Sequence, residues 1–215
     1  QALVVLVPVL RRPHRVQPLL ASLHANTPDP VRALFICDTD DLEEQAAVRK
    51  CGGELLVHDG SYASKITAGV QATTEPLVFT AADDLHFTPH WLERAKRKLG
   101  RGIHVVGVND MCTRRVMAGK HATHFLMTRA YALRPTIDGG PGPFCHRYDH
   151  SYCDDELVAT ASFRGVIAFA RDSIVEHHHW LNEKADDDEI YQKGRANMRA
   201  DRDLYVSRQP LWTSQ

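Results

Sequence analysis

Residues 77–84 read LVFTAADD, a short apolar run that ends directly in two aspartates, Asp83 and Asp84. Such a run is typical of a β-strand that is buried on both faces of a sheet. The carboxyl end of a strand in an α/β sheet lies at the edge where these sheets bind ligands. Two unpartnered carboxylates are costly to bury there unless a cation compensates their charge. The stretch therefore indicates either a divalent metal site or the N-terminal cap of a helix that begins near Pro89.

Strands and helices alternate around this stretch. Apolar, β-branched runs predict strands at residues 4–10, 31–37, 54–58, 77–80 and 102–108. Helical patterns separate them at residues 16–23, from the 38–41 acidic turn to about residue 50, at 63–73 and at 91–99. Strands that alternate with helices at this spacing predict a parallel α/β sheet with right-handed crossovers.

The second half of the chain has a weaker pattern. Residues 127–133 suit a short helix or a strand, and residues 154–161 suit the start of a helix. Short strands are expected at 166–170 and 173–175, and a C-terminal helix from residue 189 to about residue 206. Because no internal repeat and no long linker divides the chain, we expect one domain.

Composition excludes several classes of protein. The 215 residues are 43% hydrophobic and 25% charged, with a formal net charge of -1, which is typical of a globular chain. No apolar run approaches the roughly 20 residues that cross a bilayer. The near-neutral charge provides no overall field that would attract nucleic acid. Five cysteines without a C-x-x-C pair indicate neither a disulfide framework nor a zinc site, so a cytoplasmic location is expected.

Histidines are abundant, and three of the 13 are consecutive at residues 177–179. In an extended segment, residues i and i+2 point the same way, so the imidazoles of His177 and His179 can face one ion. The alternative is a polar strand end with solvated histidines.

Five motifs carry a family resemblance. They are VPVLRRP at residues 7–13, KITAG at 65–69, FTAADDLHFTPHWL at 79–92, CDDEL at 153–157 and VEHHH at 175–179. The chain resembles the family-2-like glycosyltransferases with the GT-A fold, and in particular their small phage- and prophage-type members. This resemblance implies a single GT-A domain with a mostly parallel nucleotide-binding sheet and a mixed C-terminal half. Residues 1–110 would bind the nucleotide sugar, and residues 111–215 would complete the metal and acceptor sites.

The resemblance also implies a metal site. Asp84 matches the last acidic position of the D-x-D element, which holds Mn²⁺ or Mg²⁺, and Asp83 would lie beside the ribose or the sugar. The first acidic position of the element is Ala82 here, so Asp84 and His86 instead resemble a D-x-H variant in which the histidine joins the metal. His177 and His179 would complete the shell. Oxygen ligands alone favour Mg²⁺, whereas imidazole ligands shift the preference toward Mn²⁺.

Further roles follow from the same resemblance. Asp154 matches the aspartate that takes the proton from the acceptor hydroxyl, with Asp155 as the alternative base; both can instead cap a helix. Arg11, Arg12 or Lys184 would help to neutralise the leaving diphosphate. The nucleotide-sugar pocket would comprise Pro8, Arg11, Asp38, Lys65, Asp83 and Asp110. The acceptor side would comprise His124, Asp149 and His150.

The sequence indicates the sugar donor more clearly than the acceptor. Either a glycan or a hydroxymethylated base in phage DNA fits the resemblance, and the phage reading places the protein in the host cytoplasm. DNA requires a basic surface beside the site, and two stretches offer one: Lys96, Arg97, Lys98 and Arg101, or Lys193, Arg195, Arg199, Arg202 and Arg208. No protein partner is implied. A metal-dependent nucleotidyltransferase or a phosphoesterase is the competing class, because aspartate pairs and histidines build those sites too.

Overall fold

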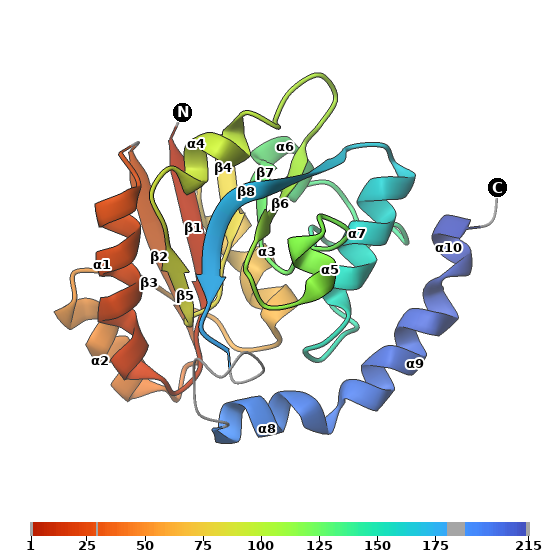
Figure 1. Ribbon diagram of the computed structural model, residues 1–215. Helices are drawn as coiled ribbons and strands as arrows, with labels where there is room; N and C mark the ends of the chain where they lie inside the picture. The colour runs from red at the N-terminus through yellow and green to blue at the C-terminus, as the bar shows by residue number, and fades with distance from the viewer. Residues whose placement is uncertain (1, 29, 180–187, 214–215) are drawn as a thin grey trace.

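The computed structural model describes residues 2–28, 30–179 and 188–213, without the side chain of Lys193. These residues form a single α/β domain around an eight-stranded sheet with the order β3-β2-β1-β4-β7-β6-β8-β5. The strands are β1 Leu3–Pro8, β2 Val31–Cys37, β3 Glu54–Val57, β4 Leu77–Thr80, β5 Leu85–Phe87, β6 Val105–Asn109, β7 Phe125–Thr128 and β8 Ile167–His177. Helices cover both faces of the curled sheet (Figure 1).

The helices of the described residues follow the chain around the sheet. They are α1 Val16–Asn26, α2 Leu42–Lys50, α3 Tyr62–Ala72, α4 Trp91–Lys96, α5 Arg114–Met117, α6 Arg129–Ala132, α7 Cys153–Phe163, α8 Glu189–Ala196, α9 Met198–Arg208 and α10 Pro210–Thr213, with a 3₁₀ turn η1 at Pro13–Arg15. None of them is long and apolar enough to cross a membrane.

The N-terminal half confirms the predicted alternation. Strand β1 pairs in parallel with both β2 and β4, and β2 pairs in parallel with β3. Side chains of β1 alternate between two cores, with Leu3 and Val5 on the face covered by α1, and Val4 and Leu6 on the face covered by α3. The carboxyl ends of these strands therefore meet at one edge of the sheet.

The second half departs from a regular parallel sheet. The predicted strand at 102–108 is β6, but β7 lies between it and β4 and runs antiparallel to both. The two short strands expected at 166–170 and 173–175 are one strand, β8, whose register against β6 shifts after Val108. Strand β5 was not predicted; it pairs antiparallel with β8. Six strands still run in one direction, because only β7 and β5 are reversed.

The C-terminal helices cross the outside of the domain. Helix α8 lies below the carboxyl ends of the strands, and α9 rises along the side that carries α7 (Figure 1). The single helix expected from residue 189 is divided near Asn197 into α8 and α9. Asp201 of α9 accepts hydrogen bonds from the backbone N–H groups of Asp149, His150 and Ser151. This contact fixes α9 against the loop before α7.

Candidate active site

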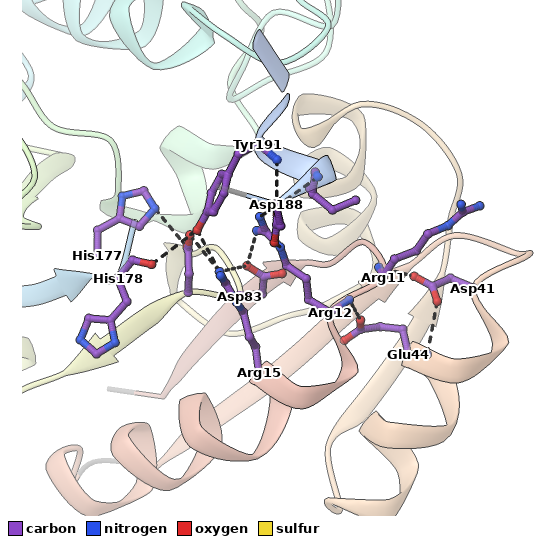
Figure 2. Close-up of polar contacts among 12 residues, drawn as sticks. Arg11, Arg12, Arg15, Asp41, Glu44, Asp83, His177, His178, Asp188 and Tyr191 are labelled. Atoms are coloured by element: carbon purple, nitrogen blue, oxygen red, sulfur yellow. Dashed lines mark hydrogen bonds and ion pairs between the residues drawn. The ribbon is translucent and has the colours of Figure 1, made fainter. Parts of the chain in front are cut away.

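Two arginines from the segment after β1 face the acidic pair at the end of β4. The carboxylate of Asp83 lies 3.3 Å from Arg12 Nη1 and 3.4 Å from Arg15 Nη1, and Asp84 Oδ2 lies 3.2 Å from Arg15 Nη1. Both aspartates are buried. Figure 2 shows the two guanidinium groups reaching toward Asp83 from the loop and 3₁₀ turn that precede α1. Arg12 and Arg15 thus partly neutralise the charge of the two aspartates.

The first residues of α8 close over these arginines. Asp188 receives two hydrogen bonds from Arg12, of 2.8 Å from Nε and 2.6 Å from Nη2. The ring of Tyr191 lies 4.0 Å below the guanidinium of Arg12, which is a cation–π contact. The Tyr191 hydroxyl donates a 2.7 Å hydrogen bond to Asp84 Oδ2 (Figure 2). Asp188 also caps α8, because it accepts from the backbone N–H groups of Ile190 and Tyr191.

His177 is the nearest imidazole to the acidic pair. Its Nε2 lies 3.1 Å from Asp84 Oδ1, because β8 pairs with β5 so that His177 is opposite Leu85. Burial alone would raise the pKa of Asp84, but His177 and Tyr191 outweigh burial and hold that pKa below its usual range. Burial and the charge of Asp84 raise the pKa of Asp83. The two aspartates thus differ in environment, and Asp84 is the ionised one.

A second group of side chains surrounds His177. Asp110, which follows β6, and His124, which precedes β7, offer ligand atoms that lie with one of His177 within 4.8 Å of one another. The His124 ring meets that of His177 edge to face at 5.2 Å. Burial, and then the charge of His177, lower the pKa of His124 to about 4, so its imidazole is neutral at pH 7. Asp110 was predicted in the nucleotide-sugar pocket and His124 on the acceptor side; the structure brings both to the histidine cluster.

The other two predicted metal ligands are placed differently. His86 is exposed and its ring stacks on that of His178 at 5.6 Å, whereas Asp84 is buried in the turn that precedes β5. Successive side chains of a strand alternate between its faces, so Leu85 points inward and His86 outward. The structure therefore does not bring His86 to Asp84. The ring of His179 lies 4.9 Å from His177 and 4.4 Å from Tyr191, at the margin of the cluster.

The predicted nucleotide residues line the loops after β1 and β2. Lys65 reaches from α3 to Asp38 Oδ1 at 2.8 Å and to the carbonyl of Val9 at 3.0 Å. Pro8 is the last residue of β1. The backbone N–H of Arg11 donates to Asp41, whereas its exposed guanidinium lies 3.1 Å from Asp40. Helix α2 is capped by Asp41, so Asp38 does not cap it.

The two candidate bases lie in the first turn of α7. Asp154 Oδ2 lies 3.2 Å from Nε2 of His121, and Asp155 lies 3.8 Å from Nδ1 of the same ring and 3.3 Å from Arg115. Burial and then the charge of Asp154 raise the pKa of Asp155. Burial raises the pKa of the Tyr62 hydroxyl, and Cys153, Asp154 and Asp84 add to this rise, against the side chain of Thr80, which lowers it.

We expect His121 to stabilise the fold most at low pH. Burial disfavours the charged imidazole, but Asp154 and Asp155 outweigh burial and Arg115, so its pKa lies above its ordinary value. Its stabilising contribution is complete below about pH 6.5 and is lost as the pH rises through the raised pKa. His121→Gln should cost about 1 kcal/mol at low pH and less at about pH 9, measured by urea unfolding. An NMR titration that places this pKa below its ordinary value would contradict the prediction.

Asp149 and His150 hold the C-terminal helices. Asp149 Oδ2 accepts a 2.9 Å hydrogen bond from Asn197 between α8 and α9, and the His150 ring lies against Gly194. A β-carbon at Gly194 would approach His150 Cδ2 to 2.9 Å, so glycine permits this contact. Arg12, expected to help neutralise the leaving diphosphate, lies beside Asp83, whereas Lys184 lies outside the described residues.

One predicted basic patch is far from this site. Strand β5 runs away from Asp84, so α4 and the patch of Lys96, Arg97, Lys98 and Arg101 lie at the opposite edge of the sheet (Figure 1). A cavity of about 680 Å³ between α1 and α4 lies there too, lined by residues including His24, Asn26, His90 and Arg97. In the second patch, Arg208 is buried in an ion pair with Glu156.

Sequence reasoning missed Arg15, Asp188 and Tyr191 as members of the site. Arg15 lies three residues after Arg12 across a helical turn, and that spacing places both on one side. The sequence alone could therefore have indicated Arg15 as a neighbour of Arg12 in the site. Tyr191 is separated from its partner Asp84 by 107 residues, and no local pattern predicts that contact.

The fold is that of the GT-A type glycosyltransferases, as the sequence resemblance implied. The mannosyltransferase PcManGT of Pyrobaculum calidifontis, solved with GDP-Man and Mn²⁺, superposes with a TM-score of 0.69 at 14% identity, covering 97% of this chain and 64% of that one. Glucosyl-3-phosphoglycerate synthase of Mycobacterium tuberculosis, solved with Mn²⁺, UDP and glucosyl-3-phosphoglycerate, gives a TM-score of 0.63 at 14% identity, covering 97% of this chain and 79% of that one.

A third solved structure, TarS residues 1–349 of S. aureus with UDP, gives a TM-score of 0.59 at 14% identity, covering 81% of this chain and 59% of that one. The chain thus spans about two thirds of the mannosyltransferase and less of this TarS fragment. No protein-family model and no curated protein matches the sequence. At these identities the similarity establishes the fold.

Proposed function

We propose that the protein is a metal-dependent glycosyltransferase that moves a sugar from a nucleotide sugar, with a UDP-sugar favoured, to an acceptor hydroxyl. The observation that carries this proposal is the buried Asp83–Asp84 pair at the end of β4, which faces Arg12, Arg15 and His177. Carboxylates, imidazole and guanidinium groups together suit a metal-bound diphosphate. Solved structures of similar fold that contain UDP or GDP-Man support the same function.

The residues at this edge fit Mn²⁺ or Mg²⁺. Asp84 Oδ1 is buried and faces His177 Nε2 at 3.1 Å, and an ion held by both groups would replace this ion pair. Asp84 and His177 would hold the ion, with His179 nearby. When bound, the ion neutralises charge on the leaving diphosphate. Similar folds contain Mn²⁺ or Mg²⁺ beside UDP.

Asp154 would act as the base. It would accept the proton of the acceptor hydroxyl while that oxygen bonds to the anomeric carbon and the bond from this carbon to the diphosphate breaks. Attack opposite to the leaving group inverts the anomeric centre. His121, 3.2 Å from Asp154, orients the carboxylate. Arg12 and Arg15 would hold the diphosphate through charge-assisted hydrogen bonds.

The acceptor is a hydroxyl group of either a hydroxymethylated pyrimidine in phage DNA or a glycan, and DNA has the weaker support. The patch on α4 is at the other edge of the sheet, and Arg208 is engaged with Glu156. The exposed Arg199 and Arg202 of α9 remain as phosphate contacts. A cytoplasmic location, where nucleotide sugars are made, belongs to the proposal, and the five free cysteines agree with it.

Nucleotide diphosphates are expected to stabilise the protein in a metal-dependent way. At a hundredfold excess over its dissociation constant, a ligand of the folded state adds about 2.7 kcal/mol, which corresponds to a Tm increase of about 5–11 °C. UDP, GDP, UDP-glucose, UDP-N-acetylglucosamine and GDP-mannose would each be tested with and without Mn²⁺. The nucleotide that produces the shift identifies the donor base.

Transfer assays on hydroxymethylated DNA and on glycans would follow with that donor. If no nucleotide shifts Tm, the proposal fails. Release of phosphate from a simple phosphoester by the same protein would then support the phosphoesterase alternative.

A further inference from the structure

Three buried residues from neighbouring strands meet beside Asp84. Strand β6 lies between β7 and β8. It runs parallel to β8 and antiparallel to β7. The end of β6, the start of β7 and the end of β8 therefore lie at one edge of the sheet. Asp110, His124 and His177 occupy these three positions. Their ligand atoms lie within 4.8 Å of one another. Two ligand bonds of about 2.2 Å span at most about 4.4 Å, so the side chains would have to close in only slightly on one ion.

Three buried polar atoms of Asp110 and His124 have no hydrogen bond of normal geometry to the described residues. Asp110 is 0% exposed and His124 is 2% exposed. Asp110 Oδ2 and both ring nitrogens of His124 are buried and make no hydrogen bond of normal geometry within the part of the chain that the structure describes. Buried polar atoms are normally satisfied by a hydrogen bond, a water molecule or an ion. A water molecule or an ion at this cluster would satisfy these atoms.

Charge indicates that the occupant is a cation. With His177 neutral, as a metal ligand must be, the carboxylates of Asp84, Asp110 and Asp188 outnumber the two guanidinium groups of Arg12 and Arg15 by one, and Asp83 adds a second negative charge when it ionises. Excess negative charge is costly in a buried setting. A divalent ion would balance it.

We propose that Asp110, His124 and His177 form a binding site for a divalent transition-metal ion, which the protein takes up without a nucleotide. Two imidazoles and one carboxylate favour Mn²⁺, Fe²⁺, Co²⁺ or Zn²⁺ over Mg²⁺, which prefers oxygen ligands. The site deepens the proposed function and rests on it for the role of the ion, because His177 also faces Asp84. Binding itself is testable without a sugar donor.

An arrangement without metal competes with this proposal. His177, if protonated, lies between two carboxylates, with Nε2 at 3.1 Å from Asp84 and Nδ1 at 3.9 Å from Asp110. In that ion triad, Asp84 and Asp110 are both paired with His177. The two ring nitrogens of His124 still have no hydrogen-bond partner among the described residues. His124 is therefore the residue that separates the two arrangements.

The test is a Mn²⁺ titration of the whole protein after EDTA treatment, with no nucleotide present, followed by the EPR signal of free Mn²⁺. One ion should bind per chain, Zn²⁺ should displace it, and excess Mg²⁺ should not. His124→Gln and Asp110→Asn should each weaken binding by at least about tenfold. His178→Gln is the matched control, because His178 is adjacent but half exposed and turned toward Glu176 and His86, and its affinity should be unchanged.

Pulsed EPR gives a readout that does not depend on affinity. Nitrogen coupling to bound Mn²⁺ should be present in the parent and in His178→Gln, and reduced in His124→Gln, with circular dichroism showing that each variant is folded. Absence of Mn²⁺ binding, or binding that neither variant weakens, overturns the proposal. If Mn²⁺ binds only with UDP, the site fails and the glycosyltransferase stands. If Mn²⁺ binds and no nucleotide diphosphate does, the site stands and the glycosyltransferase fails.

Discussion

Replacing Asp84 with asparagine is expected to lower kcat/KM for sugar transfer by about a thousandfold or more. A metal ion supplies several kcal/mol of charge stabilisation in the transition state, and each 1.36 kcal/mol is about tenfold in rate. Asp84 is the carboxylate that faces His177 at 3.1 Å, Arg15 at 3.2 Å and Tyr191 at 2.7 Å. Asparagine preserves the shape of the side chain but removes its charge, so the loss should come from chemistry rather than from packing.

The matched control is Asp172→Asn, which removes an exposed carboxylate from β8 away from the site and should leave turnover unchanged. Both variants would be assayed for transfer and for donor hydrolysis across a Mn²⁺ series, with Tm as the check on folding. Full, metal-dependent activity in Asp84→Asn would disprove the assignment of this residue.

The second large effect is on stability. Arg208→Ala should lower the free energy of unfolding by about 3–5 kcal/mol, because it leaves a buried carboxylate without its partner. Arg208 is 3% exposed and donates two 2.7 Å hydrogen bonds to Glu156 of α7 and a third, also 2.7 Å, to Asp138. The hydroxyl of Tyr148 donates to the same Glu156 at 2.7 Å. This network attaches α9 to the helix that carries both candidate bases.

Urea unfolding would measure the loss, with Arg202→Ala as the control on the exposed face of the same helix. That control should change the free energy by no more than about 0.5 kcal/mol. Arg208→Met combined with Glu156→Gln should recover part of the loss, because both charges are then removed. A decrease below about 1 kcal/mol in Arg208→Ala would show that the network is not the anchor of α9.

Local patterns in the sequence were sufficient for the N-terminal half of the fold. The runs at 31–37 and 77–80 are strands β2 and β4 with the predicted bounds, and α3 spans Tyr62–Ala72, one residue from the expected helix. In this half, β1, β2 and β3 are neighbours in chain order, whereas β4 returns to pair with β1, and each crossover joins parallel strands. The position of Asp83 and Asp84 at the ligand edge follows from the same rule.

The second half could not be predicted in this way. Which strands pair with β6 depends on contacts between segments far apart in the chain, and β7 and β8 offer few local signals for their order. Strand β5 has three residues, too few for a pattern of its own. Its formation turns the side chain of His86 outward, and for that reason a spacing that suggested a metal ligand produced an exposed histidine.

The sequence by itself determined the class of fold, the acidic edge of the sheet and the choice of Asp84, His177 and Asp154 as candidates, because each depends on a strand or helix terminus. Only the tertiary structure decided that Asp110 and His124 join His177, that Asp188 and Tyr191 cover Arg12, and that Asp149 holds α9. These contacts join residues from separate elements. They exist because strand order and the path of the C-terminal helices bring distant side chains into one buried volume.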